Sequence, residues 1–145
     1  MIVRRPALGG AVLALGLVLA ACSADDGSTV TPSPDPDGPV VVTFEVAGGE
    51  TFKALLTDPA DIAIARQLLA GEPAPGIPNG VVVRSETSVN DGYSWSYDPE
   101  QFEFADMTIE VCDGLPSDVE AGLVTSDRYC PWSAQVIAIE PAPGG

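Results

Sequence analysis

The chain carries three cysteines, and the surroundings of the first one predict covalent chemistry. Cys22 follows Leu19-Ala20-Ala21 at the end of an apolar run, Ala7–Ala20, which itself comes after Arg4 and Arg5. Positive charges, a short apolar run and small residues before a cleavage point are typical of an export signal. The pattern therefore predicts cleavage just before Cys22 and acylation of its sulfur.

The four residues Leu19-Ala20-Ala21-Cys22 resemble the lipobox of bacterial lipoprotein signal peptides. The apolar run before them is shorter than the about 20 residues that a membrane span needs. The resemblance implies a diacylglyceryl group on Cys22 and an anchor on the extracytoplasmic side of the cell membrane. Two acyl chains suit such an anchor, because each buried methylene contributes about 0.8 kcal/mol and one chain binds only marginally. An ordinary secretory signal, without a modified cysteine, is the alternative.

Acidic residues dominate the composition, with 21 Asp and Glu against six Lys and Arg and no histidine. Loss of residues 1–21 removes Arg4 and Arg5, which leaves four basic residues and a net charge of −17. Nucleic acid is excluded as a partner, because phosphate binding needs clustered Lys and Arg. The acidity suits a docking face for a cationic partner or divalent cations, or, more commonly, a repelling surface that keeps an exported protein soluble.

Cys112 and Cys130 remain as a pair once Cys22 is assigned to lipid. An even number of cysteines in an oxidising compartment favours a disulfide. The bridge would close a loop of 18 residues and contribute about 3 kcal/mol by the chain-entropy model. A zinc site on the two thiolates is disfavoured, because a structural zinc ion takes four Cys or His ligands.

The absence of histidine from the sequence excludes the Ser-His-Asp and Cys-His mechanisms and the commonest zinc hydrolase sites. A serine–lysine hydrolase would depend on Lys53, the single lysine, which no distinctive serine motif accompanies. Paired carboxylates could still act as acid and base on a glycosidic bond. Acidic residues suited to such a pair are Asp98, Glu100, Glu103, Asp106, Glu110 and Asp113. Because acids of this kind are common on exposed strand faces, we expect no catalysis, with a glycosidase-like hydrolase as the alternative.

Calcium is the metal that the acidic residues would suit best. Asp91-Gly92, Asp113-Gly114, Asp118 and Glu120 could offer oxygen ligands, but their spacing does not match the twelve-residue loop of an EF-hand. A turn at Asp91-Gly92 and a helix cap at Glu120 account for these residues more simply. We therefore expect no metal and no cofactor.

Tyr93, Trp95 and Tyr97 are the strongest candidates for ligand binding, because alternate residues share one face of a strand. An open face of this kind could stack on sugars or bind a protein. An inward face would belong to the core, which is the favoured placement in a chain with only nine aromatic residues. Trp132, next to Cys130, is expected to pack over the disulfide.

A single domain, Val40–Pro141, must position these side chains. Residues 22–39 before it are rich in Pro, Ser and Asp and predict a semi-extended tether of at most about 50 Å, and residues 142–145 form a tail. Alternating apolar residues in Val40–Val46 and Thr51–Leu56 predict two strands of a hairpin that turns at Gly48-Gly49.

The best-specified helix follows the hairpin. Asp58 is the expected N-cap, Pro59 the first helical residue and Asp61 part of the first turn, and Gly71 ends the helix. Ser117-Asp118-Val119-Glu120 predicts a capping box for a short second helix.

Further strands are predicted from Val81 after a proline-rich loop and over Tyr93–Tyr97, Phe102–Cys112 and Gln135–Ile139. The long strand changes phase, because Phe102 and Phe104 are even-numbered whereas the next apolar residues, Ala105, Met107, Ile109 and Val111, are odd-numbered. A β-bulge near Phe104-Ala105 would turn both sets toward one core. The pattern predicts a strand-rich α+β fold, mostly antiparallel and sandwich- or barrel-like, with one or two peripheral helices.

Short motifs spread over nearly all of Val40–Ile139 resemble the BP-seventy-four amino-terminal domain family. The most specific are Glu110-Val111-Cys112-Asp113 and the later Cys130-Pro131-Trp132-Ser133. The others are Leu56-Thr57-Asp58-Pro59, Ile62, Ala65-Arg66, Gly71, Asn90, Trp95-Ser96-Tyr97, Ile109, Val119-Glu120 and an aromatic residue, Tyr129, before the second cysteine. The chain lacks the histidine that members often carry near the asparagine. The resemblance implies a fold and a disulfide and transfers no catalytic residue.

These features together predict a membrane-tethered extracytoplasmic lipoprotein with a small, non-catalytic binding domain. The expected partner, besides the membrane that holds the lipid anchor, is a protein or a carbohydrate. A carboxylate-dependent extracellular hydrolase and an inhibitor of such a hydrolase are the alternatives.

Overall fold

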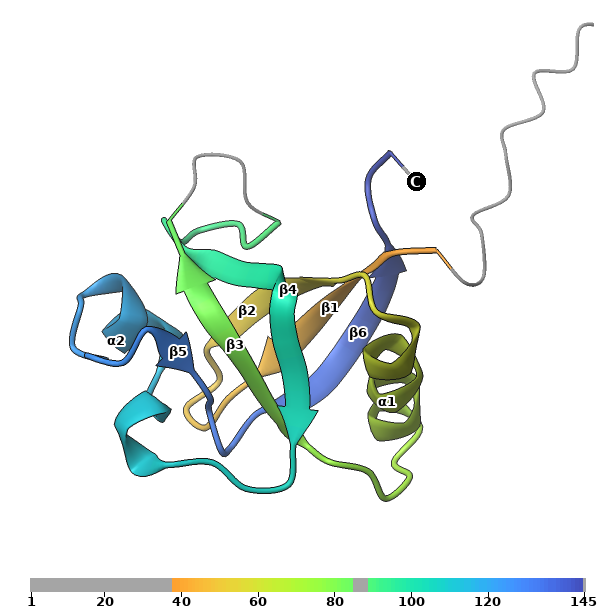
Figure 1. Cartoon of the computed structure of the whole chain (residues 1–145), viewed down its shortest axis with the longest axis horizontal. Helices are drawn as coiled ribbons and strands as arrows, with labels where there is room; N and C mark the ends of the chain where they lie inside the picture. Colours follow the sequence, from red (N-terminus) through yellow and green to blue (C-terminus); the bar gives the residue numbers. More distant parts are fainter. Residues whose placement is uncertain (1–37, 85–88, 145) are drawn as a thin grey trace, which may run out of the picture. The chain divides into compact units, whose positions relative to one another are not determined.

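Two three-stranded antiparallel sheets make up the core of the described part of the protein (Figure 1). The structure is a computed structural model, and it describes residues 38–84 and 89–144. The first sheet has the order β2-β1-β6, with β1 at Val40–Glu45, β2 at Thr51–Leu56 and β6 at Gln135–Pro141. The second has the order β4-β3-β5, with β3 at Ile77–Val83, β4 at Ser96–Ala105 and β5 at Arg128–Tyr129.

Two helices and one short turn accompany the sheets: α1 at Pro59–Leu69, α2 at Pro116–Glu120 and the 3-10 turn η1 at Glu110–Cys112. In Figure 1, α1 lies beside β6, whereas α2 and β5 lie at the opposite side of the sheets. The strand-rich α+β fold is confirmed, and the two sheets do not close into a barrel. Within the described residues, no helix is both long enough and apolar enough to cross a membrane.

The hairpin of β1 and β2 forms as its alternating sequence predicts. Val40 pairs with Leu56 and Phe44 with Phe52 across the two strands. Gly48 and Gly49 make the connecting turn with φ angles of 92° and 83°, which side chains other than glycine rarely adopt. The inward residues of both strands are buried, so the hairpin supplies one wall of the core.

Local signals also set the ends of α1 correctly. The Asp58 carboxylate accepts a hydrogen bond from the Ala60 N–H at 2.7 Å, and Pro59 opens the helix. Gly71 follows the last turn with φ of 75°. Ile62 and Ala65 are the buried residues of the helix, which packs chiefly against β6.

The central strands differ from the prediction. β3 begins at Ile77, so Pro78-Asn79-Gly80 belongs to a strand and not to a loop, and Val83 ends the strand. Tyr93 and Trp95 precede β4, which is one continuous strand from Ser96 to Ala105. The ladder irregularity lies on β3, between Gly80 and Val82, and not at Phe104-Ala105. A Cβ atom at Gly80 would meet the Tyr97 ring, so this glycine allows close packing within the sheet.

The second helix also begins elsewhere than predicted. α2 starts at Pro116, and the Asp118 carboxylate accepts a hydrogen bond from the Leu115 N–H at 3.0 Å. Ser117, the predicted N-cap, instead donates from its hydroxyl to Glu50 at 2.8 Å. The residue is therefore used for a contact with the hairpin turn, which sequence spacing does not reveal.

Aromatic rings join the two sheets. Phe52 on β2 has its ring centroid 5.0 Å from that of Phe44, 5.8 Å from Tyr97 on β4 and 5.5 Å from Tyr129 on β5. The Tyr97 hydroxyl within this cluster has a partner, since it donates to the Tyr129 carbonyl oxygen at 3.1 Å. The core is therefore a packed aromatic layer between the two sheets.

Candidate interaction surface

The predicted disulfide between Cys112 and Cys130 is present, with the two Cα atoms 5.1 Å apart. It joins η1 to the residue after β5, and the Cys130 N–H also donates to the Cys112 carbonyl oxygen at 2.7 Å. The bridge brings together the two motifs that carry most of the family resemblance, Glu110–Asp113 and Cys130–Ser133. These motifs therefore meet at one place in the fold.

Hydrogen bonds from side chains hold the same place. The Trp132 backbone N–H donates to the Asp113 carboxylate at 3.0 Å, and its indole N–H donates to the Thr108 hydroxyl at 2.6 Å. The Ser133 hydroxyl accepts from the Ala47 N–H at 3.0 Å, which ties the segment to the hairpin turn. The chain at residues 106–113 is therefore fixed although it belongs to no strand.

Large apolar side chains on this fixed segment face solvent. Met107 is 85% exposed, Ile109 68%, Val111 59% and Trp132 45%. We call these four residues the apolar ridge. Large apolar side chains gathered in this way on a soluble domain usually mark an interaction site.

The prediction that Met107, Ile109 and Val111 face the core is wrong. Ile77 is the first residue of β3, and it pairs with Ala105, so the ladder between β3 and β4 ends there. In Figure 1 the chain then leaves β4 and runs below β5 to η1. Because no strand covers this part of the chain in the described structure, its alternating residues have no core to enter.

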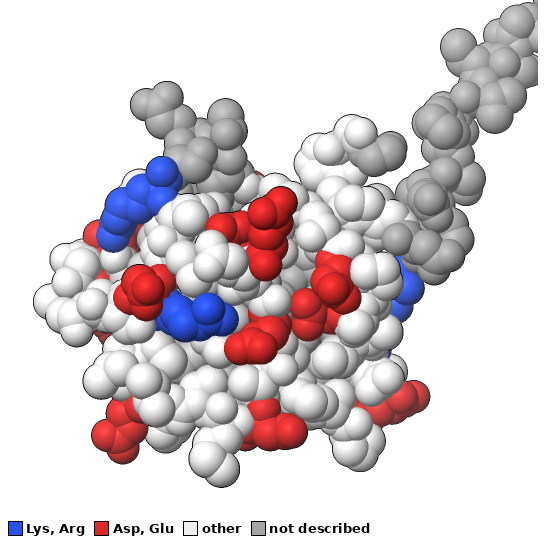
Figure 2. Space-filling model, in the orientation of Figure 1, with Lys and Arg blue, Asp and Glu red and all other residues white. Residues whose placement is uncertain are grey.

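Acidic residues alternate with the ridge along the chain. Asp106, Glu110 and Asp113 are all exposed. The ion pairs of Lys53, Arg84 and Arg128 go to other acids, namely Asp91 at 3.0 Å, Glu120 at 4.0 Å and Glu103 at 3.6 Å. Figure 2 shows the same imbalance on one face, where acidic side chains are spread widely and basic ones occupy few places. The ridge is therefore an apolar surface within an acidic one.

The aromatic row does not form an open binding face. Trp95 is 0% and Tyr97 2% exposed, so both belong to the core, as favoured from the sequence. Tyr93 is half-buried in the turn before β4, and its hydroxyl donates to Glu50 at 3.4 Å. Burial raises the pKa of Tyr97 well above its ordinary value, so its hydroxyl stays a neutral donor. Neither Trp95 nor Tyr97 reaches a ligand unless the core opens.

The acids suggested for a hydrolase have structural partners instead. Asp98 accepts hydrogen bonds from the Gln101 side chain at 2.7 Å and the Glu100 N–H at 3.0 Å. The bond from Gln101 lowers the pKa of Asp98, whereas a general acid needs a raised pKa. Glu103 bonds to Asn79 and Arg128, and Asp113 bonds to Trp132. The structure therefore does not unite these acids in an acid–base pair.

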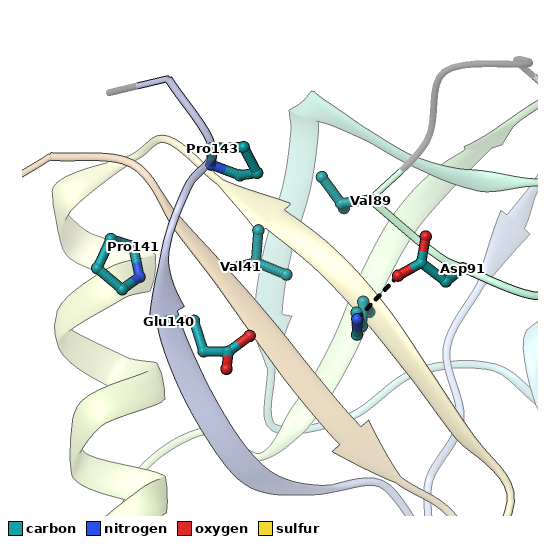
Figure 3. Close-up of a pocket in the computed structure, with 7 residues that line it drawn as sticks. Val41, Val89, Asp91, Glu140, Pro141 and Pro143 are labelled. Carbon is teal, nitrogen blue, oxygen red and sulfur yellow. Dashed lines mark hydrogen bonds and ion pairs between the residues drawn. The ribbon is translucent and has the colours of Figure 1, made fainter.

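A shallow hollow of about 240 Å³ opens beside the outer face of the first sheet (Figure 3). The Lys53 ammonium at its wall is held by Asp91, and Val89 adjoins residues 85–88, which are not described. None of the six acids suggested for a hydrolase lines it; its lining residues are Val41, Lys53, Val89, Asp91, Glu140, Pro141 and Pro143. The hollow therefore offers no catalytic arrangement.

The acids considered for calcium likewise bond within the fold. Asp118 caps α2, and Glu120 accepts from the Ser94 N–H at 2.9 Å and from its hydroxyl at 3.1 Å. In residues 38–84 and 89–144, no group of three or more Cys, Asp or Glu residues is arranged to hold a metal ion. Cys22, the predicted lipid anchor, lies outside the described residues, as does nearly all of the predicted tether.

Sequence reasoning missed the apolar ridge, although one signal pointed to it. The change of phase after Phe104 marks the end of the ladder, and it was interpreted as a bulge within a longer strand. The prediction that Trp132 packs at the disulfide is only partly informative, because its ring is half exposed and its indole N–H bonds to Thr108.

Comparison with known protein families matches residues 38–143 to the BP-seventy-four N-terminal domain. Comparisons with curated proteins and with solved structures find no match. The matched range includes both sheets, both helices and the disulfide. The chain therefore belongs to the BP-seventy-four N-terminal domain family.

Proposed function

We propose that this protein is an extracytoplasmic lipoprotein in which a lipid on Cys22 tethers a non-catalytic binding domain. The domain binds a protein partner through the apolar ridge. The observation that carries this proposal is the exposure of Met107, Ile109, Val111 and Trp132 on a segment fixed by a disulfide.

The chemistry of the ridge favours a protein over a carbohydrate. Three of its four side chains are aliphatic, whereas sugar binding relies on aromatic stacking combined with free polar groups. The one aromatic residue, Trp132, already uses its indole N–H on Thr108. Methionine and tryptophan are enriched where proteins meet, because they present large apolar area.

The bracing of the segment supports binding energetically. A segment that is ordered only on binding loses conformational freedom, at about 0.5–1.5 kcal/mol for each immobilised side chain. The disulfide and the Trp132 hydrogen bonds hold the ridge in place beforehand. An inhibitor of an extracellular hydrolase would be one form of the same binding mode.

The membrane tether is supported by the sequence. Leu19-Ala20-Ala21-Cys22 closes a short apolar run, and the Pro-, Ser- and Asp-rich residues 22–39 follow it. A chain of that composition is extended and gives the domain reach from the membrane surface. A disulfide in the domain agrees with an oxidising compartment.

Site-specific photocrosslinking in the producing cells tests the binding site. A photoreactive phenylalanine analogue replaces Ile109 or Val111 in one set of variants and the exposed apolar residues Leu69 or Ile137, outside the ridge, in the control set. We expect an adduct of discrete mass at the ridge positions alone. Equal labelling at the control positions, or no adduct at the ridge, would contradict the proposal.

The anchor is tested separately by Cys22→Ser. Loss of lipid labelling is expected, with the protein either released or retained as an unprocessed precursor. Unchanged lipid labelling would show that Cys22 is not the acylated residue.

A further inference from the structure

We infer that the apolar ridge takes a cationic protein segment, with apolar side chains that contact Met107, Ile109 and Val111 and with Lys or Arg residues among them. This inference rests on the proposed function and specifies the chemistry of its partner. Three features support it: the charges around the ridge, the places where basic residues are engaged, and the occupants that those charges disfavour.

The acids at the ridge lie on the same short segment as its apolar residues. Asp106 precedes Met107, Glu110 lies between Ile109 and Val111, and all five side chains are exposed. A partner that covers the apolar side chains must therefore approach these carboxylates as well. Lys or Arg on the partner would meet them favourably, whereas acidic groups would be repelled.

Three basic residues of the domain are engaged away from those acids. Lys53, Arg84 and Arg128 form their ion pairs with Asp91, Glu120 and Glu103, none of which belongs to the ridge segment. The Arg128 guanidinium is further fixed by hydrogen bonds to Asn79 and to the Gln101 carbonyl oxygen. These three cations therefore leave the negative potential at the ridge to a partner.

Two other occupants are disfavoured by the same charges. A second copy of this chain would place like charges against Asp106 and Glu110, and each copy carries many more acids than bases. An anionic lipid surface would be repelled for the same reason, although the predicted anchor brings the domain near a membrane. A basic protein segment is the occupant that agrees with both the apolar and the charged groups.

Binding to defined peptides tests the inference with the full chain in phosphatidylcholine nanodiscs. The probe is a fluorescein-labelled decapeptide of alternating Leu and Lys. The comparison peptides alternate Leu with Glu, or Ser with Lys. By fluorescence anisotropy we expect the Leu–Lys peptide to bind at least about tenfold more tightly than either comparison peptide.

Charge reversal at the ridge is compared with a control of the same net charge. Asp106→Lys/Glu110→Lys should weaken binding of the Leu–Lys peptide by about tenfold, because attraction becomes repulsion at the contact. Glu100→Lys/Glu140→Lys reverses two exposed acids on β4 and β6 and should change binding by less than about twofold. Ile109→Ser should weaken binding without altering its dependence on salt.

Several results would overturn the inference. These are no binding of the Leu–Lys peptide, equal binding of the Leu–Glu peptide, equal effects of the two charge reversals, binding to phosphatidylglycerol vesicles, and sedimentation as a ridge-dependent dimer. If they occur while ridge positions still crosslink in cells, the binding proposal stands and the cationic partner fails. If no ridge position crosslinks, the proposed function itself fails.

Discussion

The hairpin of β1 and β2 and the segment from Asp106 to Asp113 both carry alternating apolar residues, yet the fold treats them oppositely. In the hairpin, the alternate residues Val42, Phe44 and Phe52 are buried. In the second segment, Met107, Ile109 and Val111 are largely exposed. The difference is a partner strand: β1 pairs on both sides, whereas the ladder of β4 stops at Ala105. Alternation therefore indicates an extended chain but does not show that anything covers it.

The two regions are also held by different forces. Each large apolar side chain that the hairpin buries contributes about 1.5–3 kcal/mol. The ridge segment gains little from burial and relies on the Cys112–Cys130 bridge, worth about 3 kcal/mol, and on hydrogen bonds worth about 1 kcal/mol each. A covalent link thus allows apolar side chains to stay exposed in a fixed position.

The largest expected effect comes from truncating the hairpin core. Phe52→Ala removes a ring that contacts Phe44, Trp95, Tyr97 and Tyr129, and it should lower the free energy of unfolding by about 3–5 kcal/mol. Met107→Ala, at an exposed side chain, should change it by less than about 0.5 kcal/mol. Urea unfolding of both variants measures the difference. Comparable losses would mean that Met107 is buried and that the contrast between the regions is wrong.

The next effect concerns the covalent link. Cys112→Ala/Cys130→Ala should lower the free energy of unfolding by about 3 kcal/mol, because the unfolded chain regains the freedom of a loop of 18 residues. Hydrogen exchange should rise most at residues 106–113 and least in β1 and β2. Uniformly raised exchange would show that the disulfide stabilises the whole fold and not the ridge segment in particular.

Prediction from sequence succeeded where the signals are local. Asp58, Pro59 and Gly71 specify α1 by capping, fixed φ and a left-handed end, and each acts within a few residues of the chain. It failed where a distant residue decides. Pro78-Asn79-Gly80 looks like a turn, but Gly80 is needed because the Tyr97 ring occupies the space of its missing Cβ.

The same reason explains the candidate site. The cysteine pair was predictable from its even count, because composition and compartment suffice for it. The apolar ridge was not, since its exposure depends on where β3 begins and therefore on a long-range pairing. Ser117 shows a similar conflict, because its hydroxyl bonds to Glu50 across the fold instead of capping its own helix.

A smaller effect is expected at a residue that joins the hairpin to the turn before β4. Asn90 is 1% exposed, accepts a hydrogen bond from the Lys53 N–H at 2.9 Å and donates to the Trp95 carbonyl oxygen at 2.9 Å. Asn90→Ala leaves both backbone groups unpaired and should destabilise the protein by about 2 kcal/mol in thermal unfolding. Ser133→Ala is the matched loss of one bond, from Ala47, at the exposed ridge side, where water replaces the partner and little change is expected. A greater loss from Ser133→Ala would reverse the order of the two regions.

The smallest effect separates the acids of the two regions. The ridge acids are exposed, whereas Asp61 of α1 is partly buried against β4, and this burial raises the pKa of its carboxyl above the ordinary value of 3.8. The Phe104 N–H lowers that pKa, and Asp58 and Glu103 raise it. A raised pKa in the folded state means that the folded protein binds the proton more tightly than the unfolded chain. The resulting stabilisation is present at acid pH and is lost as pH rises through the folded-state pKa.

Asp61→Asn, which mimics the protonated carboxyl, should therefore gain about a few tenths of a kcal/mol over the native protein at pH 7, since solvent screens this half-exposed group. The gain should vanish below about pH 3, where both states of the native chain are protonated. Asp98→Asn is the control of opposite sign, because the Gln101 hydrogen bond lowers the pKa of Asp98 and its stabilisation is lost as pH falls. Chemical unfolding across this pH range measures both. Destabilisation by Asp61→Asn at pH 7 would show that the positive end of α1 stabilises the carboxylate more than burial disfavours it.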